Sequence, residues 1–178
     1  GDTRANHLGD SFLYAGRLDD QRFLSMVRFD LTRVPRGAVI EQATLRLTGL
    51  EDRRFDRADP GLWLVQLIAE ADAQDLASTD YVAAYSRPAS ITLAPLRATD
   101  LAAGKANEFV LDETIRTWMA QQLLDGAASL TVRLLPAGEE TTSLFAWDSG
   151  QGSESRGAAP ELALEVGRFG ADHGPIRE

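Results

Sequence analysis

The side chains that most often carry out acid–base or nucleophilic chemistry are sparse in this sequence, which holds two histidines and no cysteine. His7 and His173 lie near opposite ends of the chain, and no Gly-x-Ser-x-Gly elbow accompanies either of them. Zinc-type histidine spacing and a phosphate-cradling glycine loop are both missing. The 27 acidic residues leave a pair of catalytic carboxylates open, since distances in space do not follow from sequence. We therefore predict that the domain is not an enzyme.

One acidic stretch, residues 51–60, offers carboxylates to a hard cation. Asp52, Asp56 and Asp59 have the oxygen ligands that calcium prefers. Their spacing does not follow an EF-hand, and three arginines are interleaved with them. Local ion pairs and turn capping explain the stretch at least as well. A calcium site and a purely structural loop both stay open, with the structural interpretation favoured, and no other cofactor is expected.

Aromatic residues suggest a second kind of chemistry, the binding of a sugar. A sugar stacks its apolar C–H face on an aromatic ring and forms hydrogen bonds at its rim, so a site needs an exposed ring beside polar side chains. Tyr81, Tyr85, Arg87 and Trp147 lie in or next to predicted loops and are the candidates for such a glycan-binding site. The alternative, in which they pack against loops, is favoured. The other two tryptophans fall on apolar faces and are expected in the core.

Composition limits the partners that the chain can have. Its 178 residues carry 18 basic and 27 acidic side chains, a formal charge of −9, and 44% of them are hydrophobic. This is the composition of one folded domain. An acidic chain is a poor partner for nucleic acid, because a phosphate backbone needs a basic patch. The longest dense apolar run, residues 62–69, is too short to cross a bilayer, so no membrane insertion is expected.

The elements that must position these residues are mostly strands. Apolar and polar residues alternate along much of the chain, which is the period-two pattern of half-exposed antiparallel strands. Residues 35–37, Pro-Arg-Gly, supply a turn between two of them. The expected strands are residues 23–29, buried on much of both sides, 43–47, 62–68, 91–93, 130–134 and 162–166. Short strands separated by turn residues predict an all-β fold, an antiparallel β-sandwich of jelly-roll type.

Helical spacing interrupts this pattern once. Apolar residues recur every three or four positions from Ile115 to Leu123, with Asp112 as a candidate N-cap and Gly126 as a candidate stop. We predict one short helix near residues 112–125 that covers an open end of the sandwich. For residues 69–84, a helical turn and a long loop both stay open. The predicted domain spans residues 1–169, and residues 170–178 form a polar C-terminal tail.

Three sequence blocks add a family resemblance. The first, Asn6 to Gly16, holds Asn-x-x-Gly and then a Leu-x-x-Gly strand; the second, Met26 to Leu47, holds Arg-Phe-Asp-Leu, a proline and Ala-x-Leu-x-Leu. The third runs from Val110 past Trp118 to Ala-Trp-Asp-Ser at 146–149 and Ala-Pro-Glu-Leu at 159–162. In this order and spacing the blocks resemble the DNRLRE-type extracellular β-sandwich domain, a family related to carbohydrate-binding modules.

The resemblance implies a non-catalytic, extracellular module of cell-surface proteins or of secreted polysaccharide-acting enzymes. Our first hypothesis is a surface scaffold or adhesive module, including a self-assembling subunit of a fibre or layer. Its partners would be copies of itself or adjacent domains of a surface protein. The family also begins with a strand that is missing ahead of Asp2, and an edge left without it is expected to recruit a strand from elsewhere. The alternative hypothesis is a carbohydrate-binding module that binds a polysaccharide.

Overall fold

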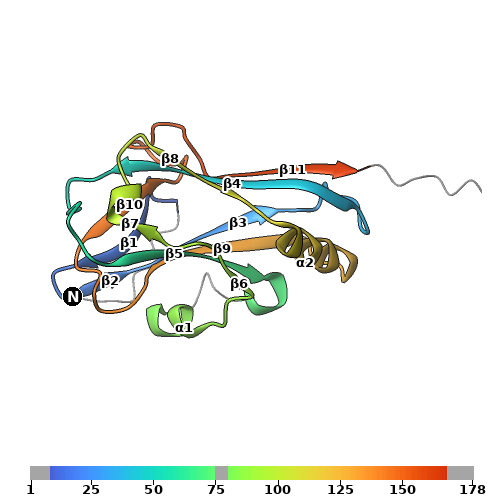
Figure 1. The fold of residues 1–178 in the computed structure, drawn as a ribbon, viewed down its shortest axis with the longest axis horizontal. Coiled ribbons are helices and arrows are strands. Elements are labelled where there is room, and N and C mark those ends of the chain that lie inside the picture. The colour runs from blue at the N-terminus through green and yellow to red at the C-terminus, as the bar shows by residue number, and fades with distance from the viewer. Residues whose placement is uncertain (1–8, 75–79, 168–178) are drawn as a thin grey trace, which may run out of the picture.

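Two antiparallel sheets pack against each other in the computed structural model, which describes residues 9–74 and 80–167 (Figure 1). The β4 sheet runs in the order β11-β4-β10-β1-β2, with β8 also paired to β4. Its strands are β1 (Phe12–Leu18), β2 (Gln21–Phe23), β4 (Val39–Glu51), β8 (Ala106–Val110), β10 (Leu144–Asp148) and β11 (Glu161–Gly167). The all-β antiparallel sandwich predicted from the sequence is confirmed.

The second layer, the β5 sheet, runs in the order β3-β9-β5-β6, with β7 also paired to β5. Its strands are β3 (Ser25–Asp30), β5 (Leu62–Ala69), β6 (Ile91–Thr92), β7 (Leu96–Arg97) and β9 (Ser129–Pro136). Trp63, Val65 and Leu67 alternate along β5 and are fully buried between the sheets. Because alternate side chains of a strand point to opposite faces, Leu64, Gln66 and Ile68 belong to the outer face of this sheet.

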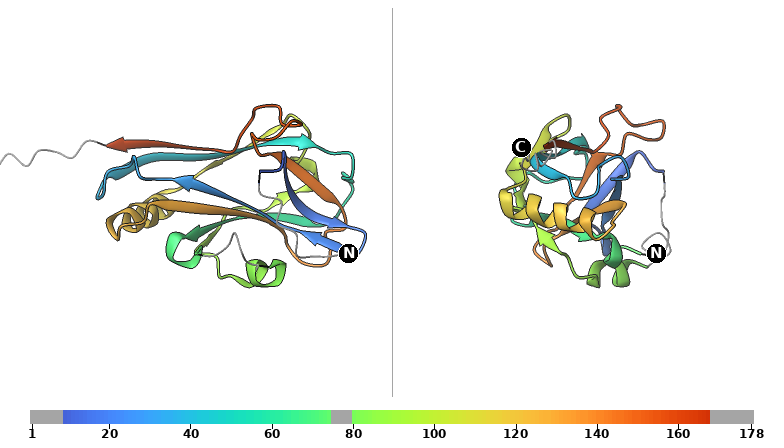
Figure 2. Two further views of the ribbon diagram at one scale, coloured as in Figure 1. Left: turned by 180° about the vertical axis from the view of Figure 1, so that it is seen from behind. Right: turned by 90° about the vertical axis from the view of Figure 1, so that its right-hand side faces the viewer.

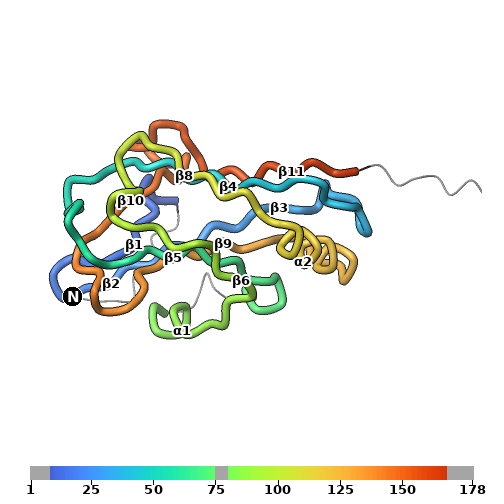
Figure 3. The backbone as a smooth tube through the Cα atoms, in the orientation of Figure 1, coloured from blue at the N-terminus to red at the C-terminus, as the bar shows by residue number. Residues whose placement is uncertain are grey.

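The segment predicted as one strand over residues 23–29 is divided between the two sheets. Phe23 pairs with Gly16 of β1, whereas Ser25 pairs with Leu134 of β9. The chain therefore crosses from one sheet to the other at Leu24, as the path from β2 into β3 in Figure 3 shows. Period-two alternation predicted the extended backbone correctly, but it carries no information on which sheet each half would join.

The helices cover two different parts of the sandwich. Helix α2 (Glu113–Leu124) begins after Asp112, whose carboxylate accepts a hydrogen bond from the Ile115 amide, and it lies at one end of the sandwich against β4. The 3₁₀ turn η1 (Glu70–Asp72) and helix α1 (Tyr81–Ser86) follow β5, and Figure 1 shows α1 beside the β5 sheet. A second 3₁₀ turn, η3 (Ala98–Asp100), follows β7. No helix among the described residues has the length and hydropathy to span a membrane.

An apolar core fills the space between the sheets. It includes Trp63, Phe145 and Trp147, each with no exposed surface, together with Met119 and Leu123 from α2. Aliphatic strand residues complete it. The tryptophan of α2, Trp118, packs against this core while half-buried. The predicted core placement of these aromatic residues is thus observed for Trp63 and Trp118, and Trp147 joins them.

Candidate functional site

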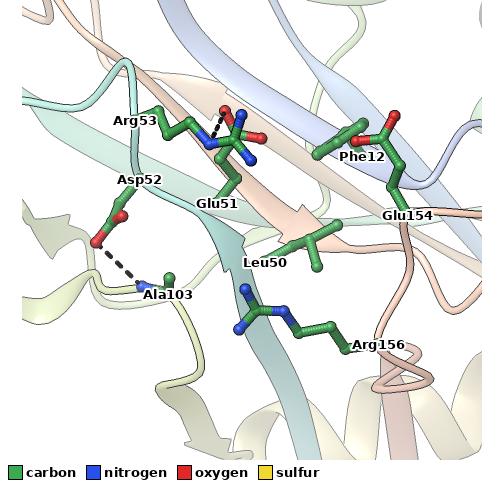
Figure 4. A pocket seen from close by; sticks show the side chains of 8 residues that line it. All are labelled: Phe12, Leu50, Glu51, Asp52, Arg53, Ala103, Glu154 and Arg156. Atoms are coloured by element: carbon green, nitrogen blue, oxygen red, sulfur yellow. Dashed lines mark hydrogen bonds and ion pairs between the residues drawn. The ribbon is translucent and has the colours of Figure 1, made fainter.

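A shallow cavity of about 130 Å³ lies on the outer face of the β4 sheet, beside the loop that joins β10 to β11 (Figure 4). Leu13 and Ala15 of β1 pack into the core, so Phe12 and Tyr14 point to the opposite, outer face. Glu51 shares that face, because both Glu51 and Tyr14 pair with Ala146. The cavity is lined by Phe12, Leu50, Glu51, Asp52, Arg53, Ala103, Glu154 and Arg156.

Aromatic side chains of β1 and β2 form one wall of this site. The rings of Phe12 and Tyr14 are nearly parallel, at 12°, with their centroids 5.1 Å apart. The Phe23 ring lies 6.0 Å from Tyr14 and is tilted by 60°. All three side chains are half-buried. Because Tyr14 packs behind Phe12, the Phe12 ring is held in position at the edge of the cavity, which is what stacking on a sugar requires.

Charged side chains line the cavity beside Phe12. Arg53 Nε lies 3.9 Å from Glu51 Oε1, and Asp52 Oδ2 lies 3.6 Å from Arg57 Nη2. Figure 4 shows the Glu154 carboxylate on the side of Phe12 and the Arg156 guanidinium near Leu50. These groups provide both hydrogen-bond donors and acceptors around a small, solvent-open recess.

Burial and the charged groups near the cavity shift the pKa of the Tyr14 hydroxyl. Burial raises the pKa of the Tyr14 hydroxyl, and the nearby Glu51 carboxylate adds to this rise, against the opposing effect of Arg54. Asp10 and Glu154 raise the pKa further. The hydroxyl is therefore neutral at physiological pH and is available as both a hydrogen-bond donor and acceptor.

The loop that carries Glu154 and Arg156 is held by a buried aspartate. Asp148 is 1% exposed, and its carboxylate accepts hydrogen bonds from the amides of Gly150, Arg156 and Ala158 and from the Ser155 hydroxyl. Burial alone would raise the pKa of Asp148, but these hydrogen bonds outweigh it and keep the pKa below its usual range. The cavity thus has one wall fixed to the sheet by an ionised carboxylate.

The three candidate cation ligands do not point to a common centre. Asp59 is 7% exposed, and its carboxylate accepts hydrogen bonds from the Gly61 amide and from the amides and hydroxyls of Thr142 and Ser143. Asp56 accepts the Ala58 amide, and Asp52 pairs with Arg57. Within residues 9–74 and 80–167, no three His, Cys, Asp or Glu side chains gather in a group that could hold a metal ion.

Three of the four predicted glycan-binding residues lie together, on the opposite side of the sandwich from the cavity. The Tyr81 and Tyr85 rings on α1 stack at 5.8 Å, and Arg87, just after α1, donates a hydrogen bond to the Asp72 carbonyl at 3.1 Å. Both tyrosines are half-buried. Burial raises the pKa of Tyr81, while the nearby Arg22 lowers it.

A buried arginine fixes this helix on the β5 sheet. Arg133 of β9 is 2% exposed, and its Nε donates to Gln66 Oε1 at 3.0 Å. Its Nη1 donates to the carbonyls of Ala84 and Tyr85. A guanidinium is favourable there, because carbonyls at the carboxyl end of a helix carry partial negative charge. Burial lowers the pKa of Arg133, with an opposing contribution from Tyr85.

Trp147, the fourth candidate, is placed differently from the sequence-based expectation. It has no exposed surface, its ring packs edge to face on Phe145 at 4.7 Å, and its indole N–H donates to Asn107 Oδ1 at 3.3 Å. Leu13, its partner across the sheet, also packs on the core. Trp147 therefore offers no ring face to a sugar. The physical reason is the alternation of side chains along β10, which points Trp147 inward although the strand ends one residue later.

The sequence analysis named one residue that lines the cavity, Asp52, as a candidate cation ligand, and it missed the others. Phe12 and Tyr14 are two residues apart on a strand, a spacing that places two rings on one face. That signal alone does not say which face is the outer one. The cavity also needs Arg156 and Glu51, which are more than a hundred residues apart, and no local pattern predicts this contact.

Comparison with models of known protein families gives no match for this chain, and comparison with curated proteins gives none either. The resemblance to DNRLRE-type domains therefore stays a prediction.

Proposed function

We propose that this domain is a non-catalytic, extracellular adhesive module that binds a polysaccharide at the cavity on the outer face of the β4 sheet. The observation that carries the proposal is the supported ring of Phe12 at the edge of a recess lined by Arg53, Glu154 and Arg156. An aromatic platform beside a few polar groups is the arrangement that sugar recognition uses. The recess is shallow and open, which suits a chain that passes over the surface.

The proposal favours this site over the one expected from the sequence. In the cavity, Phe12 lies next to five charged side chains from two segments of the chain, residues 51–53 and 154–156, so several hydroxyl groups of one sugar could be bound at once. At α1, the two tyrosine rings stack on each other, and Arg87 already donates to a backbone carbonyl. The predicted tail, residues 170–178, and both histidines lie outside the described residues.

Replacing Phe12 by alanine is expected to weaken polysaccharide binding about tenfold or more, because the stacking surface is removed. Binding of the wild type and the variant would be measured by affinity electrophoresis against a panel of neutral, acidic and amino polysaccharides. Tyr85→Ala is the matched control, since it also removes a half-buried ring, from the other side of the sandwich.

The control variant should bind like the wild type. Loss of binding in Tyr85→Ala with unchanged binding in Phe12→Ala would transfer the site to α1 and overturn the proposal. Wild-type protein that binds no member of the panel would contradict polysaccharide binding itself. Circular dichroism of each variant establishes that a loss of binding is not a loss of folding.

A further inference from the structure

The outer edge of β11 is open in the part of the molecule that the structure describes. On one side, β11 pairs with β4 from Arg46 to Val39. On its other side, no strand among residues 9–74 and 80–167 pairs with it. Figure 2 shows β11 at the rim of the sandwich, beside β4. An edge strand of this kind presents backbone N–H and C=O groups that can pair with another strand.

The register identifies which backbone groups are free. The Leu111 amide donates to the Ala43 carbonyl, so Ala43 and the alternate residues of β4 direct their backbone groups to the β8 side. The backbone groups of Thr44 and Arg46 are then directed to β11, where these residues pair with Ala163 and Glu161. Along β11, the backbone groups of the intervening residues point away from β4. These residues are Leu162, Leu164 and Val166.

The same three residues leave apolar surface uncovered. Leu162 and Leu164 pack on the core but remain half-buried, and Val166 is 38% exposed. On β8, which pairs with the opposite side of β4, the inward-facing Asn107 and Phe109 are 7% and 9% exposed. The β11 edge therefore combines free backbone groups with apolar side chains that a further strand would cover, whereas the β8 edge has its inward side chains already covered.

One antiparallel register makes β11 complementary to itself. With Leu164 opposite Leu164 of a second copy, Leu162 lies opposite Val166, Ala163 opposite Glu165, and Glu161 opposite Gly167. The apolar residues meet on the inner face, and no two glutamates are opposed. Moving the centre to Ala163 would place Glu161 opposite Glu165, and moving it to Glu165 would oppose two identical carboxylates, which is unfavourable. The pairing of β11 with β4 contains a bulge after Glu165. The extra residue, Glu41, belongs to β4, so β11 itself stays regular.

We propose that two copies of this domain associate through antiparallel pairing of β11 with β11, around a twofold axis at Leu164. The free backbone groups of Leu162, Leu164 and Val166 then form the hydrogen bonds of the pair. An interface of this kind is closed, because each copy uses the same edge. The inference does not depend on glycan binding. If the cavity does bind polysaccharide, the axis stands perpendicular to the joined sheet, so both cavities face the same side.

The test introduces a charge at Ala163, the residue that lies opposite Glu165 of the second copy. Ala163 is exposed on the outer face, so Ala163→Glu should place a carboxylate opposite each Glu165 and weaken the dimer about fivefold or more, whereas Ala163→Lys should strengthen it by a similar factor. Sedimentation velocity over a range of concentrations would measure the dissociation constant, with 19.3 kDa as the mass of the monomer. Ala106→Glu is the matched control, since Ala106 is an exposed alanine on the opposite edge strand, two residues from Glu108.

A second readout reports on the backbone directly. The amide protons of Leu162 and Leu164 should exchange quickly with solvent in dilute protein and at least about tenfold more slowly at concentrations where the dimer forms. A protein that stays monomeric at all concentrations would overturn the proposal. So would an assembly that continues to grow beyond two copies, one that responds equally to Ala163→Glu and Ala106→Glu, or one that slows amide exchange in β3 and not in β11. Melting temperatures of all variants show whether the monomer remains folded.

Discussion

Replacing Asp59 by alanine is expected to lower the free energy of unfolding by about 3 kcal/mol or more. The Asp59 carboxylate is 7% exposed and joins the loop after β4 to the segment before β10 through Thr142 and Ser143. Its removal would leave those amides and hydroxyls without their acceptor in a place that water does not reach easily. Urea unfolding followed by tryptophan fluorescence would measure the loss.

Asp56→Ala is the control for this experiment. Asp56 lies in the same loop, but it is exposed and accepts one local amide, that of Ala58. Its replacement should cost less than about 1 kcal/mol. Equal losses for the two variants would contradict the structural role of Asp59. A clear rise in the wild-type melting temperature on adding calcium, absent in Asp59→Ala, would instead support the cation site considered from the sequence.

The same carboxylate predicts how stability depends on pH. Burial would raise the pKa of Asp59, but the hydrogen bonds from Ser143, Gly61 and Thr142 hold it below the ordinary value of 3.8. A group whose folded-state pKa is lowered stabilises the fold above its unfolded-state pKa, and this contribution is lost as the pH falls through the folded-state value. Unfolding free energies measured from pH 6 downward should therefore decrease below about pH 4.

Asp59→Asn should remove part of this pH dependence, because the asparagine amide does not ionise. The variant should also be less stable at neutral pH, because the NH2 group of asparagine is itself a donor and cannot accept from the Thr142 and Ser143 amides. Asp148→Asn should remove another part for the same reason, since hydrogen bonds from Ser155, Gly150, Arg156 and Ala158 also lower the Asp148 pKa. A variant with the full wild-type slope would show that its carboxylate is not the titrating group.

Replacing Trp147 by alanine should be the other large loss, about 3–5 kcal/mol. The side chain is fully buried, packs on Phe145 and donates to Asn107. The variant leaves a cavity and an unpaired Asn107 carbonyl oxygen. Chemical unfolding would measure the change, with Tyr85→Ala as a half-buried aromatic control that should cost less. A Trp147→Ala protein of wild-type stability that has lost polysaccharide binding would contradict the core role and restore the sequence-based hypothesis.

Alternation was sufficient to predict the fold because it reports which residues share a face of a strand. Residues 62–68 and 130–134 were expected as strands and lie within β5 and β9. The expected helix near residues 112–125 corresponds to α2, since the cap at Asp112 is a local signal. Within the described part of residues 69–84, η1 and the first residues of α1 are helical, which agrees with the helical alternative.

The site was harder to predict because its contacts are long-range. Trp147 and Phe12 lie on neighbouring strands, and only the pairing register shows that one points inward and the other outward. Asp59 depends on Ser143, 84 residues away, so its role as a loop anchor has no local signature. The sequence analysis therefore expected Trp147 beside an open loop, whereas the structure buries it, and it did not name Phe12.

The central claim, polysaccharide binding at the cavity beside Phe12, is tested most directly by titrating the isotope-labelled domain with soluble oligosaccharides and following backbone amide chemical shifts. The predicted result is a set of saturable shifts confined to the lining residues, namely Phe12, Leu50 to Arg53, Ala103, Glu154 and Arg156. Shifts that centre on Tyr81 to Arg87, or no shifts with any neutral, acidic or amino oligosaccharide, would contradict the claim.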